Sequence, residues 1–232
     1  MHKKLYQAVF DGIIERIVGG EYGPGTMLPN EFDIAANFGV SQGTARKALI
    51  ELEKKRIVER RQGKGTFVTL RTPENSLFHF FRLRDKSGAQ VVPDLSFEDV
   101  KRRAASTKER ELLSGAPDQV FEVRRLRSFD GTPLGLETSI VSCALFPGLL
   151  ERAPLPNTLY VLFQQAYACA IISAQDSLSA GLAREEAGIL GVTPTTPVLV
   201  AHRQAYDLLE RVVEIRHSVF RTDKVNYSVA LN

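Results

Sequence analysis

The chain has 232 residues, of which 44% are hydrophobic and 25% charged, a balance typical of a globular protein with room for two modest domains. No apolar run approaches the ~20 residues of a membrane-spanning helix, and the basic start lacks the features of a secretory signal. Cys143 and Cys169 are the only cysteines, which excludes a disulfide-rich scaffold. We therefore expect a cytoplasmic protein with no membrane partner.

Positive charge is concentrated in the first third of the chain. Residues 1–70 hold 11 Lys+Arg against 8 Asp+Glu, whereas residues 71–232 hold 19 of each. Within residues 41–65 the counts are 8 basic and 3 acidic. Charge alone is equally consistent with a solvated basic helix face, but any contact with a polyanion is expected here.

Apolar periodicity and turn residues predict an N-terminal unit with helices over 5–18, 31–37 and 42–55 and strands over 57–61 and 66–69. Asn30 and Ser41 are good N-caps for the second and third helices. Gly39 separates these helices because it adopts positive φ without strain. The order of elements is typical of a helix-turn-helix followed by a basic hairpin, the wing.

In a helix-turn-helix, the N-terminus of the last helix lies nearest the base edges, and polar or basic side chains there contact bases and phosphates. A glycine-flanked wing tip brings further basic residues to a groove. The candidate DNA-binding residues are Ser41, Gln42, Gly43, Thr44, Arg46, Lys47, Arg61, Gln62, Gly63 and Lys64. The same glycines do not form a phosphate-binding P-loop, since the required spacing is absent.

Four motifs follow one another in the N-terminal unit: Leu28-Pro29-Asn30-Glu31, Phe38-Gly39-Val40-Ser41, Thr44-Ala45-Arg46-Lys47-Ala48-Leu49 and Glu59-Arg60-Arg61-Gln62-Gly63-Lys64-Gly65-Thr66-Phe67-Val68. With them, residues 5–69 resemble the DNA-binding domain of GntR-family regulators. Phe32 and Gln42 depart from the pattern, because the family commonly has arginine at both positions. The resemblance therefore implies operator binding with an altered operator sequence, since glutamine favours adenine where arginine favours guanine.

The remaining chain alternates strands and helices. We predict strands over 78–84, 120–128, 134–142, 197–206, 212–220 and 227–231, and helices over 146–151, 159–168 and 183–190. Asp130-Gly131 is a strong hairpin turn, and residues 73–76 read as a linker. Hairpin pairs with interspersed helices indicate an α+β domain with an antiparallel sheet. The predicted domains are 1–70, a linker over 71–76, and 77–232.

Residues 77–232 resemble the UTRA effector-binding domain of the HutC-type branch of the GntR family. The motifs that carry this resemblance include Arg124-Arg125-Leu126-Arg127, Asp130-Gly131-Thr132-Pro133-Leu134, Leu145-Phe146-Pro147-Gly148-Leu149 and Thr158-Leu159-Tyr160. The resemblance implies a chorismate-lyase-like sheet with a small-molecule pocket. The residues that match family pocket positions are Arg125, Arg127, Glu137, Thr158, Tyr160, Glu214 and Phe220.

Arg125 and Arg127 are two residues apart on one predicted strand, so their side chains share a face and form a fork suited to carboxylate or phosphate. The alternative is that Arg125 forms a cross-strand ion pair with Glu137. Ala170 and Cys143 depart from the sugar-phosphate-sensing pattern of the family. We expect an anionic effector without assigning it to the phosphosugars.

Two other functions remain open at this point. An enzyme is disfavoured because the histidines have no metal-ligand spacing and no nucleophile elbow is present; His217 near Glu214 is the strongest acid–base candidate. The second open function is that of an architectural DNA-binding protein without an effector. The sequence favours a homodimeric transcription repressor that binds double-stranded operator DNA and responds to a small anionic metabolite, with no cofactor and no metal.

Overall fold

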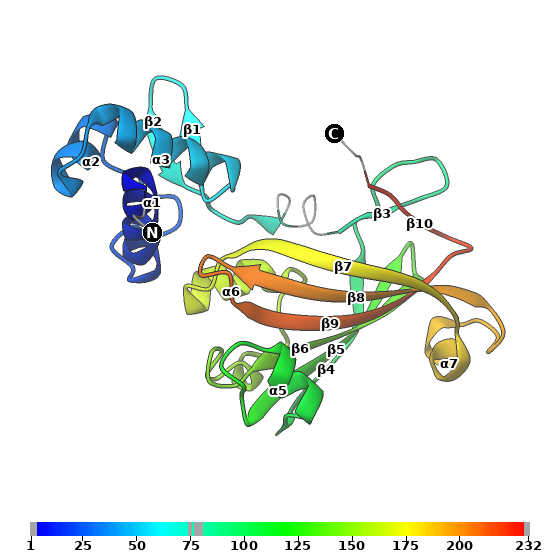
Figure 1. The fold of residues 1–232 in the computed structure, drawn as a ribbon. Coiled ribbons are helices and arrows are strands. Elements are labelled where there is room, and N and C mark those ends of the chain that lie inside the picture. Colours follow the sequence, from blue (N-terminus) through cyan, green and yellow to red (C-terminus); the bar gives the residue numbers. More distant parts are fainter. Residues whose placement is uncertain (1–3, 74–75, 77–80, 230–232) are drawn as a thin grey trace.

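The computed structural model describes residues 4–73, 76 and 81–229. Figure 1 shows two lobes: N-terminal helices with a small hairpin, and a curved antiparallel sheet with helices around it. The N-terminal elements are α1 (Leu5–Val18), α2 (Glu31–Phe38), α3 (Gln42–Lys54), β1 (Val58–Arg61) and β2 (Gly65–Val68). They agree with the predicted helix-turn-helix and wing.

The capping residues explain where the N-terminal helices begin and end. The Asn30 side chain accepts hydrogen bonds from the Phe32 and Asp33 amides at 2.9 and 3.0 Å, and so starts α2. Gly39 ends this helix in the left-handed conformation, with φ of 62°. The apolar faces of the three helices pack on one another around Leu49 and Leu52, which are buried.

The C-terminal lobe is built on one large sheet. Within the described residues, its strands are β4 (Asp94–Ala104), β5 (Gln119–Phe129), β6 (Thr132–Ser142), β7 (Ile171–Leu182), β8 (Pro197–Asp207) and β9 (Val212–Arg221). The order across the sheet is β4-β5-β6-β9-β8-β7, and every neighbouring pair is antiparallel. Asp130 and Gly131 both have positive φ, at 48° and 71°, which confirms the predicted hairpin turn between β5 and β6.

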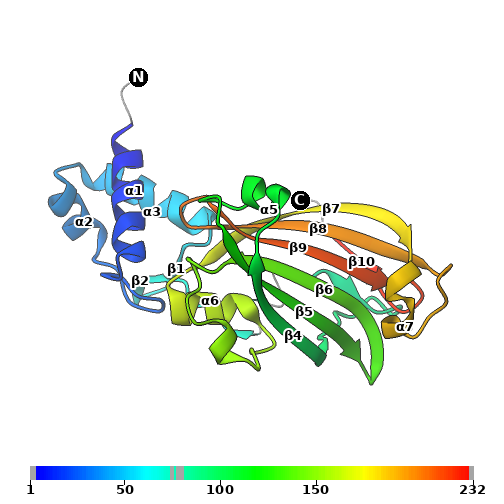
Figure 2. The same cartoon turned by 90° about the horizontal axis from the view of Figure 1, so that it is seen from below.

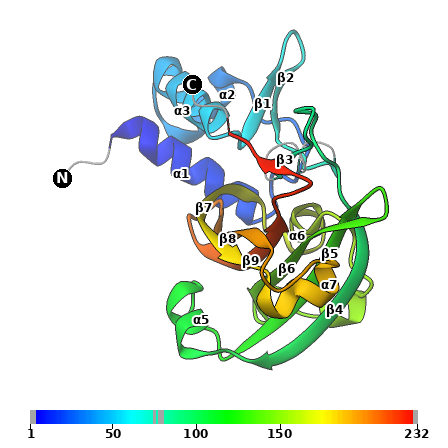
Figure 3. The same ribbon diagram turned by 90° about the vertical axis from the view of Figure 1, so that its right-hand side faces the viewer.

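Helices cover both faces of this sheet. α6 (Leu159–Tyr167) packs on the face that carries Val123 and Val141, which we call the α6 face. α7 (Ala187–Leu190) and the segment after α5 (Thr107–Leu112) pack on the opposite face. Figure 3 shows α5 and α6 on opposite sides of the sheet, and Figure 2 shows α7 at the end remote from the N-terminal lobe.

Several sequence predictions need correction. Residues 146–151 do not form a helix, because Gly148 has φ of 72°; only a short 3-10 turn, Leu150–Arg152, is present. Of the predicted strand over 78–84, residues 81–84 are described, and among these only Leu83–Arg84 form a strand, β3, which pairs with β10 (Asn226–Tyr227) in a separate small sheet. Residues 74–75, 77–80 and 230–232 lie outside the described part of the chain.

The sequence pattern did not predict β4, α5 or β7. Both strands are edges of the sheet and expose most of their side chains, so neither shows a clear apolar alternation. α5 buries no residue and has no apolar face that a pattern search detects. The helix expected over 183–190 begins as a 3-10 turn, Arg184–Glu186, before α7.

The two lobes touch through the end of the sheet nearest α1. Leu208, from the turn between β8 and β9, is buried in the N-terminal core, with Ala170 and Ile172 packed beside it. The Lys55 ammonium lies 2.9 Å from a Glu210 carboxylate oxygen across the same junction. The helix-turn-helix unit is therefore in contact with the turn that joins the neighbouring strands β8 and β9.

Candidate DNA interface and effector site

The first turn of α3 presents polar groups at a helix N-terminus. The Ser41 hydroxyl accepts from the Thr44 amide at 3.2 Å and lies 2.9 Å from the Thr44 hydroxyl. Gln42 and Gly43 follow the cap and are exposed. The remaining N–H groups of this turn and the positive end of the helix dipole favour a phosphate or a base acceptor.

The basic side chains of α3 are held loosely and remain accessible. Arg46 is 65% exposed, and its nearest carboxylate, that of Glu31, is 4.0 Å away. The Lys47 ammonium lies over the Tyr6 ring, 4.5 Å from its centroid, and the residue is exposed. Exposed pairs of this kind contribute little to stability, so the two side chains are free to exchange partners for phosphate.

The wing turn is shaped by glycine. Gly63 and Gly65 have φ of 70° and 122°, in the left-handed region that other residues avoid. Arg61 donates to Glu59 at 2.8 Å and lies over the Phe67 ring at 4.4 Å, while Lys64 is exposed in the turn. Of the ten residues predicted from sequence, nine are exposed and Thr44 is half-buried. They share one surface on α3 and the wing.

Phe32 adds an unusual apolar group beside this surface. It is 71% exposed in the first turn of α2. Its neighbour Glu31 lies 4.0 Å from Arg46 on α3 and 3.4 Å from Arg60 on the wing. An exposed aromatic ring next to the DNA-reading helix suits contact with a thymine methyl group rather than a hydrogen bond to guanine.

The predicted effector residues converge on the α6 face. Strand register places Arg125 opposite Glu137 and Glu137 opposite Ser218, and alternation puts Arg127, Glu214 and Phe220 on the same side. Tyr160 extends from α6 onto this face, and Thr158 is the N-cap residue of that helix. All seven are buried, from 0% exposed for Glu214 to 9% for Thr158.

Ion pairs connect these charges, with partners other than those expected. Arg125 donates to Glu98 on β4 at 2.8 Å instead of pairing with Glu137. Glu137 accepts from Arg127 at 2.7 Å and lies 3.5 Å from Arg216. Arg125 and Arg127 nevertheless share a face, and both donate to the Asn157 carbonyl at 3.3 Å. The arginine fork predicted from the sequence is present, but carboxylates of the protein occupy it.

A second group of contacts ties α6 to the sheet. The Tyr160 hydroxyl donates to Glu214 at 2.5 Å, and Arg216 donates to the other oxygen of the same carboxylate at 2.7 Å. The Arg216 guanidinium also lies over the Tyr160 ring, 5.4 Å from its centroid. Burial and the Glu214 charge raise the pKa of Tyr160, so this hydroxyl keeps its proton and remains a donor.

Burial alone would raise the pKa of Glu137, but the charges of Arg127 and Arg216 lower it to about 2. Burial lowers the pKa of Arg125 to about 10 despite its pairing with Glu98. Both groups are therefore ionised at neutral pH. The α6 face is a charged network inside the protein, held together by mutual neutralisation.

Sequence reasoning missed five further members of this network: Glu98, Asn157, Asp176, Arg203 and Arg216. Arg203 forms a two-point pair with Asp176, with both N–O distances at 2.7 Å. Arg216 was detectable, because it lies two residues after Glu214 on a predicted strand and so shares its face. Glu98 and Asp176 were not, since they lie on the edge strands that the pattern did not predict.

The network leaves little free space. A cavity of about 20 Å³ lies among Glu137, Asp176, Arg203, Arg216, Ser218 and Phe220, with Phe81 and Tyr227 covering it. This volume holds about one water molecule and no metabolite. The site is closed in this conformation, and a ligand must displace the covering residues or the internal ion pairs.

Two family descriptions match the chain. "Bacterial regulatory proteins, gntR family" matches residues 5–68, and "UTRA domain" matches residues 89–226. The first match contains the helix-turn-helix and wing, and the second contains the large sheet. No helix of the described residues is long and apolar enough to cross a membrane.

Curated relatives are transcription regulators. The chain is 29% identical to the mannosyl-D-glycerate transport/metabolism system repressor MngR of Escherichia coli, covering 98% of this chain and 96% of that protein. It is 28% identical to the repressor PhnF of Mycolicibacterium smegmatis, covering 90% and 85%. These relatives are regulators and not enzymes, in agreement with the sequence prediction.

Solved structures show the same architecture. The ligand-binding domain of a GntR-family regulator from Bordetella bronchiseptica superposes with a TM-score of 0.60 at 26% identity, covering 66% of this chain and 98% of that one. PhnF from Mycobacterium smegmatis has a TM-score of 0.57 at 24% identity, covering 97% and 99%. The second likeness extends over both lobes and supports the fold alone.

Proposed function

The chain belongs to the GntR family of bacterial regulatory proteins and has a UTRA domain, and on this premise we propose that it is an operator-binding repressor released by a small anionic metabolite. The observation that carries the proposal is the exposed surface on α3 and the wing, where Arg46, Lys47 and Lys64 have no strong internal partner among the described residues. We assign residues 1–70 to DNA binding, 71–76 to the linker and 77–232 to effector binding.

The DNA contact follows from the positions of these groups. The N-terminal turn of α3 enters the major groove, where Gln42 and Arg46 face base edges, while Ser41, Thr44 and the helix amides hold phosphate. Arg61 and Lys64 extend the contact from the wing. The protein acts as a homodimer, because a single recognition helix reads only a few base pairs and a second half-site raises affinity and specificity.

The effector binds on the α6 face. A carboxylate or phosphate takes the place of the Glu98 or Glu137 carboxylate against the arginine fork, since charge-assisted pairs with guanidinium are bidentate and strong. Glu214 and Asp176 accept from hydroxyl or amino groups of the same molecule. Replacing an internal carboxylate leaves the arginines neutralised, and their pairing with the ligand offsets the desolvation cost of its charge. The displaced glutamate takes up a proton or turns to solvent.

α6 offers a route from the effector to the DNA-binding unit. Tyr160 and Gln164 are four residues apart and lie on the same side of the helix. The Gln164 amide donates to the Thr69 carbonyl at 3.0 Å and accepts from the Arg71 amide at 2.7 Å. A ligand that replaces the Tyr160–Glu214 contact shifts α6. The hydrogen bonds of Gln164 then move the segment that directly follows the wing.

Selection from a random-sequence DNA pool with the full chain tests operator binding. We expect enrichment of a two-fold symmetric site, and light scattering of the complex should give the mass of the DNA plus about twice the 25.8 kDa chain mass. A monomer on DNA at micromolar concentration contradicts the dimer, and absence of enrichment contradicts the regulator.

A thermal-shift screen of metabolites followed by DNA-release measurements tests the effector route. Gln164→Leu should keep ligand stabilisation but lose ligand-induced release of DNA, whereas Gln165→Leu, an exposed neighbour on α6, should leave both unchanged. Normal release in Gln164→Leu contradicts this route. No stabilisation by any metabolite favours an architectural role.

A further inference from the structure

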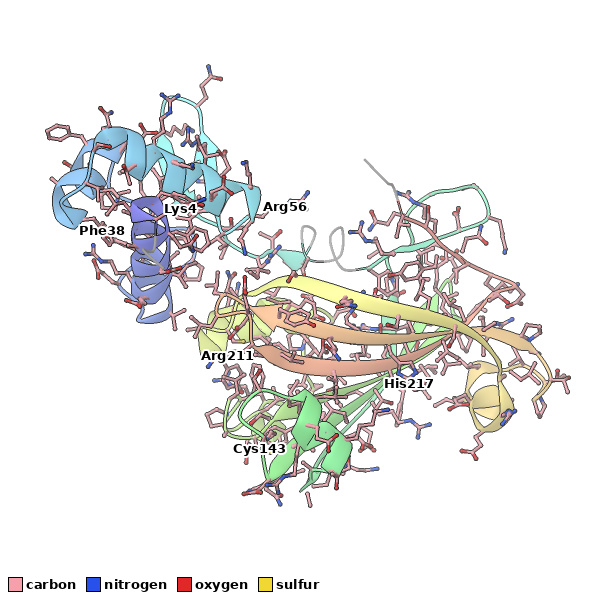
Figure 4. The ribbon with its side chains drawn as sticks, viewed as in Figure 1. Lys4, Phe38, Arg56, Cys143, Arg211 and His217 are labelled. Carbon is pink, nitrogen blue, oxygen red and sulfur yellow. The ribbon has the colours of Figure 1, made fainter. Side chains whose placement is uncertain are left out.

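The face of the sheet opposite the effector residues carries a pair of histidines. Strand register places His202 on β8 directly opposite His217 on β9. Their rings are 4.7 Å apart between centroids and inclined by 38°, and the two Nδ1 atoms lie 3.4 Å apart. Both residues are exposed, and Figure 4 shows His217 on the sheet between the ends that α5 and α7 occupy.

The separation of these nitrogens matches a metal chelate. Two imidazole ligands at about 2.0–2.1 Å from a tetrahedral zinc ion lie about 3.3–3.4 Å apart, from the tetrahedral angle. The observed 3.4 Å therefore lets one cation bind both Nδ1 atoms without moving the strands. Without a cation, the same distance allows one proton to be shared between the rings.

The surroundings favour a cation. Both histidines line an open cavity of about 590 Å³ between α5 and the sheet, so an ion and its water ligands have access. In the same register row, Ser177 lies beside His202 and Thr138 beside His217, and their hydroxyls suit hydrogen bonds to metal-bound water.

We propose that His202 and His217 form a binding site for a borderline divalent cation such as Zn²⁺ or Co²⁺. Among the described residues there is no group of three or more His, Cys, Asp and Glu side chains that could hold a metal, so water completes the coordination. Imidazole nitrogen selects this class of ion over Mg²⁺ and Ca²⁺, which prefer oxygen.

A bound cation would join β8 and β9, two neighbouring strands of the sheet. His202 precedes Arg203 and His217 follows Arg216, and both arginines belong to the charged network on the α6 face. A metal link between β8 and β9 therefore stabilises the backbone that supports the effector residues. Its occupancy raises the melting temperature of the chain without contacting the effector itself.

Titration of the tag-free full chain with Co²⁺ and with Zn²⁺ tests the site. We expect one ion per chain, a visible cobalt spectrum of nitrogen and oxygen ligands, and a Zn²⁺-dependent rise in melting temperature. His202→Gln and His217→Gln should each weaken binding at least about tenfold, because one chelating ligand is lost. Glutamine keeps a polar side chain, and circular dichroism without metal verifies that both variants fold.

Controls separate this site from other ligands in the chain. His2→Gln and His79→Gln remove the remaining histidines, and Cys143→Ser removes the half-buried thiol; all three should bind Co²⁺ as the parent chain does. Equal binding by the His202 and His217 variants, a thiolate-to-cobalt band, or no binding at millimolar metal overturns the proposal. Because no DNA is used, none of these outcomes depends on the operator.

Discussion

The two charged regions of this protein differ in exposure and in how their charges are neutralised. On α3 and the wing, Arg46 and Lys64 are exposed, and no carboxylate of the described residues lies closer to Arg46 than that of Glu31, at 4.0 Å. On the α6 face, Arg125 and Arg127 are 1% and 6% exposed, and carboxylates and carbonyls surround both. Exposed charges cost little to leave without partners and are available to a polyanion, whereas buried charges must be neutralised inside the fold.

Arginines therefore have different roles in the two regions, depending on whether they are exposed or buried. An arginine at the surface contributes to affinity for DNA and to its dependence on salt, because it displaces condensed counterions from the DNA phosphates. An arginine in the sheet contributes to specificity only when an anion replaces its internal partner. Substitution should therefore affect binding in the first region and stability in the second.

The largest expected effect is on the α6 face. Glu137→Ala leaves Arg127 and Arg216 without their shared carboxylate, and we expect a loss of about 3–5 kcal/mol in the free energy of unfolding. Urea denaturation followed by circular dichroism measures it, since the chain contains no tryptophan. Glu59→Ala, which breaks an exposed pair with Arg61, is the matched control and should cost under about 1 kcal/mol. Equal losses of unfolding free energy in the two variants would show that the buried and the exposed ion pairs contribute equally to stability.

Acid should remove the same stabilisation. The pKa of Glu137 is lowered to about 2 in the folded chain, whereas a glutamate in an unfolded chain has a pKa of about 4.3. Its contribution is complete above the unfolded value and is lost as pH falls from about 5 toward 2. Unfolding measurements across this range should show a smaller pH dependence in Glu137→Gln than in the parent chain. An identical pH dependence would mean that folding does not shift the pKa of Glu137.

In the DNA-binding region, loss of charge should reduce affinity and leave stability unchanged. Arg46→Ala alone should cost about 1–3 kcal/mol on the selected operator, and adding Arg61→Ala and Lys64→Ala should flatten the salt dependence. Fluorescence anisotropy at several salt concentrations measures both. A triple alanine variant of Lys101, Lys108 and Arg110, exposed residues of the C-terminal lobe, provides a charge-matched control. Comparable losses in both triple variants would show nonspecific attraction only.

Phe32→Arg should alter sequence preference more than affinity. The ring is 71% exposed beside α3, and arginine there restores a guanine-reading group typical of the family. Repeating the DNA selection should show a shift toward G·C at one position of each half-site, with discrimination of about 1–3 kcal/mol. An unchanged selected sequence would place Phe32 outside the operator contact.

The smallest effect should come from the exposed pair between the lobes. Lys55→Ala removes the 2.9 Å contact with Glu210, and we expect a change within about 1 kcal/mol in stability. Chemical denaturation is sensitive enough to bound it. A larger loss would show that this junction behaves like the buried network and not like the surface.

Local sequence signals are sufficient to predict nearly all of the N-terminal unit. Its caps, apolar stripe and turn glycines act locally, so Asn30, Gly39 and Ser41 set the helix boundaries without help from distant residues. The candidate DNA-binding residues form one surface because they are close in the chain. The two strands that flank Asp130-Gly131 could be predicted from the sequence for the same reason.

The pairing of charges on the α6 face depends on the three-dimensional fold. Glu98 lies 27 residues from Arg125, and Tyr160 lies 54 residues from Glu214, so no local pattern links them. Their strands and helix are brought together by sheet register, and two of the partners lie on edge strands whose polar sequences carry no clear period. Neutralisation of a buried charge depends on distance in space, which residue spacing along the chain does not encode.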